Sequence, residues 1–482
     1  MSNPLAPSWL MPPDDANALP ASVWSQNATR TGDGELMIAG VTASALAREF
    51  GTPVYVVDEH DVRSRAEQIR SSFDREFARV GGTAKVYYAG KAFLCTEVAR
   101  WMIAAGLNID VASGGEMAVA LAAGIDPARL GLHGNNKSLV EIDRAVSVGV
   151  GALVIDSVVE VERVAAAATR HGRVQAVRLR INSGVHASTH EYLATAREDQ
   201  KFGIPLADAA AVVALIRAEP SLRFLGLHSH IGSQIFESDG FAEAARRLFA
   251  LHAELLEQGE VPELNLGGGF GIAYTTADDP LDIDEVARRF ADIVAHGAAE
   301  LGIPIPVVAI EPGRSVIGPS TTTLYTVGTI KDVVVTGGSE LIQLEPDRSL
   351  EVTEFGAYRA VRRYVSVDGG MSDNIRPSLY GANYSARLAN RVSDAEPVLV
   401  RVAGKHCESG DIVVHADYLP GDVAPGDLLA VPATGAYGWA MASNYNYLTR
   451  PPVVAVRDGA ARLIVRGETE DDLLSRDTGV TR

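Results

Sequence analysis

Lys91 is the residue of this chain with the clearest potential for covalent chemistry. It ends a run of β-forming residues that passes into the small residues Ala89 and Gly90, so we predict that a strand gives way to a helix near Lys91. Most lysines are surface residues without a chemical role. A lysine set among apolar and small residues can instead attack a carbonyl group and form a Schiff base.

Glycine-rich turns provide a second kind of group, the backbone amides that bind anions. The segment 267–271, Gly-Gly-Gly-Phe-Gly, leaves its N–H groups uncovered ahead of a predicted helix. One such loop is a weak signal. Ser233 and Gly313 each stand at the end of another predicted strand and would reach the same neighbourhood. Three loops around one anion predict a phosphate site.

Glu311 directly follows the apolar run Val308-Ala309-Ile310, so its carboxylate would be buried at a high cost unless a cation meets it. A protonated pyridine nitrogen would be such a cation, and pyridoxal phosphate needs an acidic partner at that atom. An ion pair with Arg314 is the alternative for Glu311. The flat ring of His230 suits stacking on an aromatic cofactor, although a histidine in an apolar strand can also be a core residue.

Composition and spacing disfavour several classes of function. The formal net charge of -18 at pH 7 argues against nucleic acid as a partner. No apolar run reaches the length of a membrane span, and the first residues lack the pattern of a signal peptide, so a cytoplasmic location is predicted. The two cysteines, Cys95 and Cys407, indicate no disulfide framework. His228 and His230 have no acidic or cysteine residue at metal-ligand spacing, so no metal is predicted.

The elements that position these groups alternate between apolar strands and amphipathic helices. At 482 residues the chain exceeds one hydrophobic core, so more than one domain is expected. Strand and helix pairs over residues 53–318 predict an α/β fold, a (β/α)8 TIM-like barrel with catalytic groups at the carboxyl ends of its strands. The predicted strands are the segment that ends at Lys91 and residues 107–111, 130–133, 152–156, 176–182, 224–230, 263–266 and 307–311.

Residues outside the barrel show different patterns. Short β-rich runs separated by turns predict a C-terminal antiparallel β domain over residues 319–482. Residues 1–52 are interpreted as an N-terminal tail, loose over about the first thirty residues, with a segment at 35–41 that alternates like a strand and joins the β domain. Residues 54–57 are predicted to form a strand that leads into the barrel. Residues 337–360 fit no pattern and are interpreted as a surface hairpin or loop.

Several motifs together resemble the diaminopimelate decarboxylases, a family within the alanine-racemase-like (fold type III) class of pyridoxal phosphate enzymes. The resemblance extends from about residue 51 to residue 472. The tail and the insertion at 337–360 depart from the family pattern. The motifs that carry it are Tyr88-Ala89-Gly90-Lys91-Ala92, the run from His228 to Gln234, the triple glycine, Glu311 to Arg314, Cys407-Glu408-Ser409-Gly410-Asp411 and Gly435-Ala436-Tyr437-Gly438.

The resemblance implies a role for each matching residue. Lys91 would hold pyridoxal 5'-phosphate covalently, Glu311 would pair with its ring nitrogen and His230 would stack on its ring. The phosphate would be held by Ser233, Gly269, Gly313 and Tyr437, with Arg314 beside the cofactor. The family also implies a head-to-tail homodimer in which Cys407 and Glu408 reach the active site of the other subunit, where Cys407 is the candidate proton donor.

The implied reaction is the decarboxylation of meso-2,6-diaminopimelate to L-lysine, the last step of lysine biosynthesis. The far end of this substrate bears an ammonium and a carboxylate, so its pocket needs both signs of charge. The carboxylate would be met by Arg314, Arg376, Tyr380 and Tyr437, and arginine offers bidentate geometry. Glu408 would meet the ammonium. A surface or dimer ion pair is the alternative for Arg376, and an inert buried thiol is the alternative for Cys407.

Three other functions stay open at this point. A decarboxylase of ornithine or arginine would share the cofactor site but would have no use for Arg376. A racemase would make no use of a distal pocket with two signs of charge. A protein that keeps the barrel without catalysis would tolerate the loss of Lys91 or Cys407, and both are present.

Overall fold

A computed structural model describes residues 3, 5–184, 201–230, 232, 234, 239–280, 282–336 and 359–480. The chain divides into two compact units. We call Arg63–Ile272 with Pro280–Val316 the barrel unit, and Met1–Val62 with Ala273–Asp279 and Ile317–Arg482 the β unit. The insertion predicted at 337–360 falls almost entirely outside the described residues.

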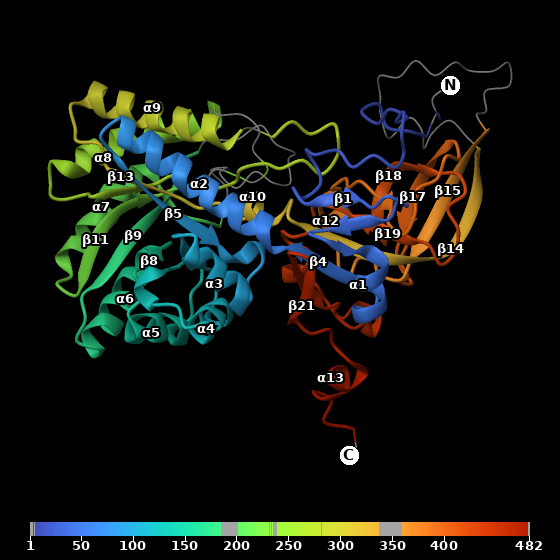
Figure 1. Cartoon of the computed structure of the whole chain (residues 1–482). Coiled ribbons are helices and arrows are strands. Elements are labelled where there is room, and N and C mark those ends of the chain that lie inside the picture. The colour runs from blue at the N-terminus through green and yellow to red at the C-terminus, as the bar shows by residue number, and fades with distance from the viewer. Residues whose placement is uncertain are drawn as a thin grey trace. The chain divides into compact units, whose positions relative to one another are not determined.

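The barrel unit confirms the strands predicted for it. They run parallel, each hydrogen-bonded to its neighbours, and the cylinder closes where β8 pairs with β9 and β13 pairs with β5 (Figure 1). Their apolar residues are buried because helices cover the outer face. The strands are β5 (Thr83–Ala89), β6 (Asn108–Val111), β7 (Leu130–Leu132), β8 (Ala152–Ile155), β9 (Gln175–Asn182), β11 (Leu222–His228), β12 (Glu263–Asn265) and β13 (Val307–Ile310).

Helices follow the barrel strands, and several of them begin at a residue that caps the first turn. The Ser138 side chain accepts a hydrogen bond from the backbone N–H of Glu141, and the Glu141 side chain accepts one from the backbone N–H of Ser138. Helix α5 therefore begins with a capping box. The same helix ends at Gly149 in the left-handed conformation. The helices are α2 (Glu59–Arg79), α3 (Thr96–Ala104), α4 (Gly114–Ala122), α5 (Leu139–Val148), α6 (Val158–Arg170), α7 (Leu206–Ala218), α8 (Asp239–Leu256), α9 (Ile283–Leu301) and α10 (Arg314–Ile317).

The β unit contains the second, mostly antiparallel sheet that the sequence predicts. Its strand order is β18-β17-β15-β14-β4-β20-β21, with β19 and β16 joined at β14. Only two short helices, α12 (Arg376–Tyr380) and α13 (Glu470–Leu474), are described in its C-terminal part. The strands are β4 (Val54–Asp58), β14 (Thr321–Thr336), β15 (Arg359–Val367), β16 (Arg387–Leu388), β17 (Pro397–Ala403), β18 (Ile412–Pro420), β19 (Leu428–Val431), β20 (Val453–Arg457) and β21 (Ala460–Val465).

Strand β4 differs from the prediction, which assigned it to the barrel. It lies between β14, to which it is antiparallel, and β20, to which it is parallel. All five of its residues are buried, so both of its faces pack against protein. A strand that is apolar on both faces fits a barrel and a covered sheet equally well, which is why its sequence did not distinguish them.

The interpretation of the first thirty or so residues as a loose tail is wrong for the described residues of that segment. Val23 and Trp24 are buried in a core cluster together with Leu36 and Ile38. Strands β1 (Ala28–Arg30), β2 (Leu36–Ile38) and β3 (Val41–Thr42) form a small antiparallel sheet of their own, and their apolar residues share a core with β4. The proline-rich and acidic start of the chain concealed these anchors.

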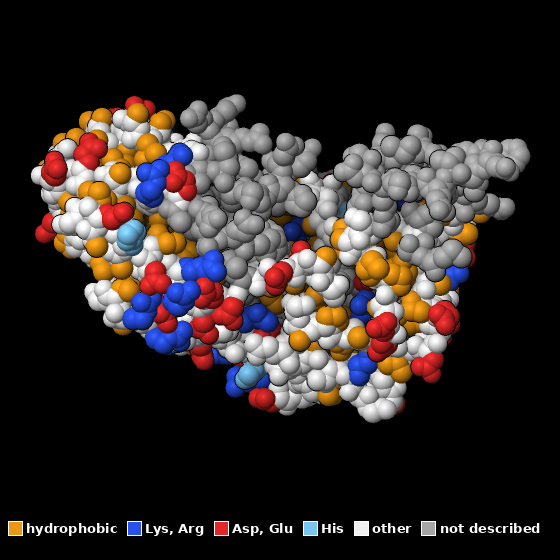
Figure 2. Space-filling model, turned by 90° about the horizontal axis from the view of Figure 1, so that it is seen from above, with side chains coloured by type: hydrophobic (Ala, Val, Ile, Leu, Met, Phe, Trp, Pro, Cys, Tyr) orange, Lys and Arg blue, Asp and Glu red, His pale blue; other side chains and the backbone are white. Residues whose placement is uncertain are grey.

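Charged side chains of both signs are mixed on the surface that Figure 2 shows. Within the barrel unit, for example, Arg75 and Asp284 lie 2.8 Å apart and link α2 to α9. Exposed pairs of this kind contribute little stability. Among the described residues, no helix has both the length and the apolar character that crossing a bilayer requires.

A buried ion pair crosses the interior of the barrel unit. The Arg178 guanidinium donates to Glu263 Oε2 from Nε at 3.0 Å and from Nη2 at 2.8 Å, and it also donates to the Tyr87 hydroxyl at 2.9 Å. Lys85 Nζ, which is partly exposed, lies 2.5 Å from Glu263 Oε1. Both members of the main pair are almost completely buried.

Arg178→Met is expected to lower the free energy of unfolding by about 3 kcal/mol, because it leaves the buried Glu263 carboxylate with Lys85 as its remaining described partner. Urea denaturation midpoints measure the loss. The double variant Arg178→Met with Glu263→Leu removes both buried charges and is expected to recover most of the stability. A single variant as stable as the parent would contradict a structural role for this pair.

Candidate active site

Lys91 stands at the carboxyl end of β5, in the one-turn helix η1 (Gly90–Ala92). Its neighbours Gly90 and Ala92 are buried, whereas the Lys91 side chain is exposed. A Cβ on Gly90 would lie 2.8 Å from the carbonyl oxygen of Asp110, so only glycine lets this turn pack against β6. The backbone therefore anchors the turn and presents the amine at the barrel mouth.

Glu311 follows β13, and its carboxylate is buried as predicted. Asn265 Nδ2 donates to Glu311 Oε1 at 2.7 Å. His228 Nε2 lies 3.0 Å from the same oxygen and His133 Nε2 lies 3.6 Å from it. Within the described part of the chain all three contacts go to Oε1 and none comes from Arg314, which was the alternative partner. Oε2 therefore remains available to a ligand.

Two histidines act on the charge of Glu311. Burial alone would raise the pKa of Glu311, but the imidazoles of His228 and His133 outweigh it and hold this pKa well below its ordinary value. Burial lowers the pKa of His228 to about 4. Near neutral pH, His228 therefore acts on Glu311 through a neutral N–H dipole rather than through a full charge. An ionised Glu311 is what a protonated ring nitrogen requires.

His133, His228 and Glu311 form a cluster that spacing along the chain did not reveal, since they end three different strands. Their donor atoms all lie within 4.8 Å of one another. Two imidazoles and a carboxylate can also hold a metal ion. The prediction of no metal came from the spacing of His228 and His230 and did not consider this cluster.

His230 and the triple glycine pack together at the ends of β11 and β12. The backbone N–H of Gly268 donates to His230 Nδ1 at 3.3 Å, so this nitrogen acts as an acceptor. Burial, with a contribution from the Lys91 charge, holds the pKa of His230 well below its ordinary value. A neutral, half-buried imidazole presents a flat face suited to stacking on an aromatic ring.

Glycine is required at two of the predicted anion-binding turns. A Cβ on Gly268 would lie 2.0 Å from the carbonyl oxygen of Glu311, and a Cβ on Gly313 would lie 3.0 Å from Ala89. Gly269 has a φ of +107°, which L-residues with side chains rarely adopt. These turns leave bare backbone at the barrel mouth. Arg314, which begins α10, is buried in the same unit, and Ser233 lies outside the described residues.

Arg376 is buried in the β unit, at the start of α12. Its Nη1 donates to the Tyr384 hydroxyl at 2.5 Å, and its guanidinium lies over the Tyr274 ring at 4.4 Å. In the described ranges of the chain no acidic side chain pairs with it, so the alternative of an ion pair is not supported there. A buried cation held by aromatic faces is a strong receptor for an anion.

Cys407 is exposed, whereas Cys95 is buried, so Cys407 is not the inert core thiol that was its alternative. Asp411 fixes the loop around it by accepting hydrogen bonds from the backbone N–H groups of Met371 at 2.6 Å and His406 at 2.7 Å. The β unit also carries the other predicted substrate residues, of which Glu408 is exposed and Tyr380 and Tyr437 are half-buried.

The structure therefore divides the predicted site into two groups. The barrel unit brings together Lys91, His230, Gly269, Glu311, Gly313 and Arg314 at the carboxyl ends of its strands, whereas Arg376, Tyr380, Cys407, Glu408 and Tyr437 belong to the β unit. Sequence reasoning missed Asp110, His133, Asn265, Tyr274 and Tyr384. Asp110, His133 and Asn265 stand at strand ends, so the rule that found Lys91 and Glu311 would have found them too.

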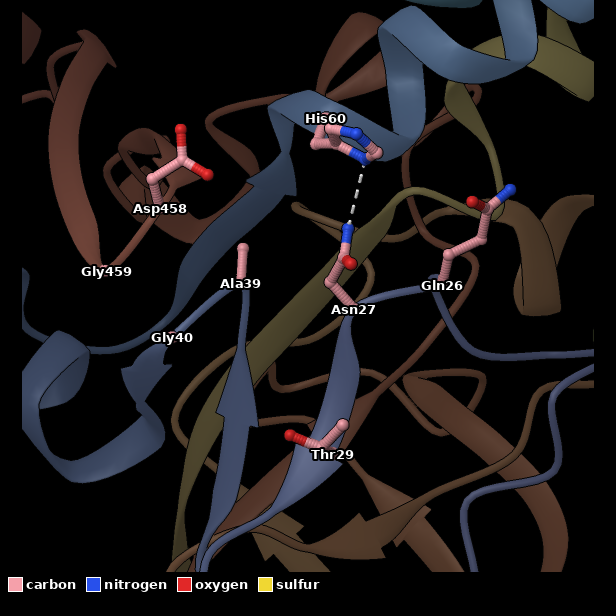
Figure 3. A pocket seen from close by; sticks show the side chains of 8 residues that line it. All are labelled: Gln26, Asn27, Thr29, Ala39, Gly40, His60, Asp458 and Gly459. Carbon is pink, nitrogen blue, oxygen red and sulfur yellow. Dashed lines mark hydrogen bonds between the residues drawn. The ribbon is translucent and has the colours of Figure 1, made fainter.

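A pocket of about 500 Å³ elsewhere in the β unit contains none of the predicted site residues. Figure 3 shows Asn27 facing His60 across it, with Asn27 Nδ2 and His60 Nδ1 3.5 Å apart. Its lining residues are Gln26, Asn27, Thr29, Ala39, Gly40, His60, Asp458 and Gly459.

Comparison with known proteins agrees with this geometry. The family described as "Pyridoxal-dependent decarboxylase, pyridoxal binding domain" matches residues 60–318, more than half of the chain. The chain therefore belongs to the class of the pyridoxal-phosphate-dependent decarboxylases.

Similarity to whole proteins narrows the class. The chain is 49% identical to diaminopimelate decarboxylase of Mycobacterium tuberculosis, with 95% of this chain and 98% of the relative covered. It is 42% identical to that of Bacillus subtilis, with 92% and 95% covered. The crystal structure of the M. jannaschii diaminopimelate decarboxylase in complex with L-lysine has a TM-score of 0.81 at 28% identity, with 95% and 98% covered. The chain belongs to the diaminopimelate decarboxylase family.

The residues of the barrel mouth fit pyridoxal 5'-phosphate, the cofactor of this family. Lys91 offers an exposed amine, and the hydrogen bond that the Glu311 carboxylate accepts from Asn265 goes to Oε1 and not to Oε2. The glycine turns leave bare backbone where side chains would clash. Each of these features is costly or unnecessary in a barrel without a ligand, so together they support the cofactor on physical grounds.

Proposed function

We propose that this enzyme removes one carboxylate of meso-2,6-diaminopimelate as carbon dioxide and yields L-lysine. The observation that carries the substrate assignment is Arg376, a buried guanidinium without an acidic partner among the described residues. Diaminopimelate brings a second carboxylate to such a cation. Ornithine and arginine bring only positive charge to the same place, which a buried arginine disfavours.

The cofactor, when bound, supplies the conjugated ring that takes up the electron pair left by the departing carbon dioxide. Lys91 holds it covalently, Glu311 keeps a proton on its ring nitrogen and His230 supports the face of its ring. Ser233, Gly269, Gly313 and Tyr437 bind its phosphate, and Arg314 stands beside it. The ionised, buried Glu311 and the neutral His230 support these two roles.

The β unit supplies most of the substrate contacts and the final proton. Arg376, with Arg314, Tyr380 and Tyr437, binds the distal carboxylate, and Glu408 binds the distal ammonium. Cys407 gives its thiol proton to the carbon that has lost carbon dioxide. The enzyme acts as a homodimer in which Cys407 and Glu408 serve the site of the other subunit. Their exposure on a loop held by Asp411 supports a role toward a neighbour.

The test of the substrate assignment is carbon dioxide release by the purified enzyme from diaminopimelate, lysine, ornithine and arginine. Arg376→Lys keeps the charge but loses the two-pronged contact with a carboxylate, so KM for diaminopimelate is expected to rise about 10- to 100-fold. Arg363→Lys is the matched control, because Arg363 makes a partly exposed pair with Asp332 in the same unit. Comparable release from ornithine, or an unchanged KM in Arg376→Lys, would contradict the assignment.

A further inference from the structure

We infer that Asp110 and His133 are positioning residues that set the charge on Glu311. They thereby set how strongly this site binds the ring nitrogen of the cofactor. The inference rests on the proposed function, because Glu311 meets a ring nitrogen only when it serves pyridoxal phosphate. Neither residue touches the cofactor in this role. Both act through Glu311.

A single nitrogen of His133 stands between two buried acids. His133 Nε2 lies 3.1 Å from Asp110 Oδ1 and 3.6 Å from Glu311 Oε1. A nitrogen placed between two carboxylates must carry a proton, since its lone pair would otherwise face theirs. The approach to each acid is within ion-pair distance but is not aligned as a hydrogen bond, so Asp110 and Glu311 compete for one nearby N–H dipole. All three side chains are at most 12% exposed, and water therefore substitutes poorly for the lost contact.

The surrounding chain holds His133 in this place. Its ring meets the edge of the His228 ring, with centroids 5.1 Å apart. The loop that follows is tied down by Lys137, whose Nζ donates to the carbonyl oxygens of Gly134 at 2.6 Å and Val154 at 2.7 Å. The buried Glu160 carboxylate lies 3.0 Å from the same ammonium. The ring contact restrains the imidazole directly, and the Lys137 contacts fix the loop that follows it.

Asp110 is also held in place by the fold. A Cβ on Gly131, in the adjacent strand β7, would lie 2.3 Å from Asp110 Oδ1. Glycine at this position therefore leaves the room that the carboxylate occupies. The pairing of Asp110 with His133 is a built feature of the strand ends and not a chance contact of mobile side chains.

The environment favours a negative charge on Glu311 over a negative charge on Asp110. Burial raises the pKa of Asp110, the His133 imidazole opposes this and the Glu311 charge reinforces it. The pKa of Glu311 is held well below its ordinary value. This difference makes Glu311 the more favourable carrier of negative charge of the two acids. The other titratable groups that face the pair and Glu311 are Lys91, Glu116, Arg178, Arg180, His228 and His230.

Substitutions at the two positions should shift the pH at which Glu311 takes up a proton in opposite directions. His133→Leu removes the N–H that stabilises the ionised form, so Glu311 takes up a proton at a higher pH and loses its hold on the ring nitrogen. Asp110→Asn removes the competing negative charge, so Glu311 keeps its charge to a lower pH. His133→Gln retains an amide N–H near the place of Nε2 and should behave like the parent enzyme.

The experiment measures cofactor binding by absorbance in the absence of substrate. Apoenzyme of each variant is titrated with pyridoxal phosphate, and the holoenzyme is then acidified to find the pH at which half of the yellow band is lost. His133→Leu is expected to weaken binding about 10- to 100-fold and to raise this midpoint. His133→Gln should restore both values, and Asp110→Asn should lower the midpoint.

Three results would overturn the inference: parental behaviour of His133→Leu, equal losses in His133→Leu and His133→Gln, or a midpoint that moves upward in Asp110→Asn. Thermal unfolding checks that each variant is folded, and Asp110→Asn decides alone if His133→Leu is not. Substrate plays no part in these measurements. A parent enzyme that binds the cofactor but releases no carbon dioxide from diaminopimelate would contradict the proposed function and leave the inference standing.

Discussion

Lys91→Ala is expected to abolish the yellow absorbance of the bound cofactor and to lower carbon dioxide release by about 10⁴-fold or more, because it removes the nucleophile that holds the cofactor. The effect should be large because two other described lysines of the barrel unit are already engaged: Lys85 pairs with Glu263, and Lys137 is buried against Glu160 and two carbonyl oxygens. An absorbance spectrum of the purified variant and an assay with saturating diaminopimelate measure the two effects.

Lys331→Ala is the control for this experiment, since Lys331 is an exposed lysine on β14 with no proposed role. It should retain both colour and turnover. The proposed chemistry would be untenable if Lys91→Ala kept the yellow band and its activity. Loss of the yellow absorbance without loss of activity would instead show that the reaction does not need the covalently bound cofactor.

Cys407→Ala is expected to slow turnover by about 10²- to 10⁴-fold while the absorbance of the bound cofactor stays as in the parent enzyme, because it removes a proton donor and leaves the cofactor site whole. Steady-state carbon dioxide release and the absorbance spectrum check the two halves of this expectation. Cys95→Ala is the matched control, as Cys95 is the other, buried cysteine of the chain. Unchanged turnover in Cys407→Ala would remove it from the reaction.

The same two variants test whether active sites are shared between subunits. If Cys407 serves the partner, a mixed dimer of Lys91→Ala and Cys407→Ala subunits contains one site with both native residues. Random exchange of subunits should therefore restore about a quarter of the parental activity. Mixing without any recovery would indicate that each subunit completes its own site.

The fold was predictable wherever local pattern determines the element. The barrel strands are short and apolar and alternate with helices, so the sequence pattern predicts each of them. Strand β4 was assigned to the wrong sheet. Its five consecutive buried residues indicate that both faces of the strand are covered, but they do not indicate which elements cover them. The buried Val23 and Trp24 were missed, since two apolar residues in a polar segment give no periodic signal.

The site was predictable where one residue carries a signal of its own. Lys91 at a strand end and Glu311 after an apolar run could each be predicted as a site residue from its own sequence neighbours. The structure places both at the carboxyl ends of the barrel strands. The contact of His133 with Asp110 and Glu311 could not be read, because it depends on three strands closing around one point. For Arg376 the sequence left a surface ion pair open, and burial between tyrosines is a property of packing alone. The roles given to the individual residues stay predictions.

The central position of β4 has a consequence for how the protein is made. This strand leaves the ribosome early, but its neighbours at 321–324 and 453–456 are synthesised hundreds of residues later. At translation rates of about 5–20 residues per second, an apolar strand with two open edges waits for tens of seconds. We therefore expect the nascent chain to need chaperone protection over this interval, and small C-terminal deletions that remove β20 to cause aggregation although they touch no catalytic group.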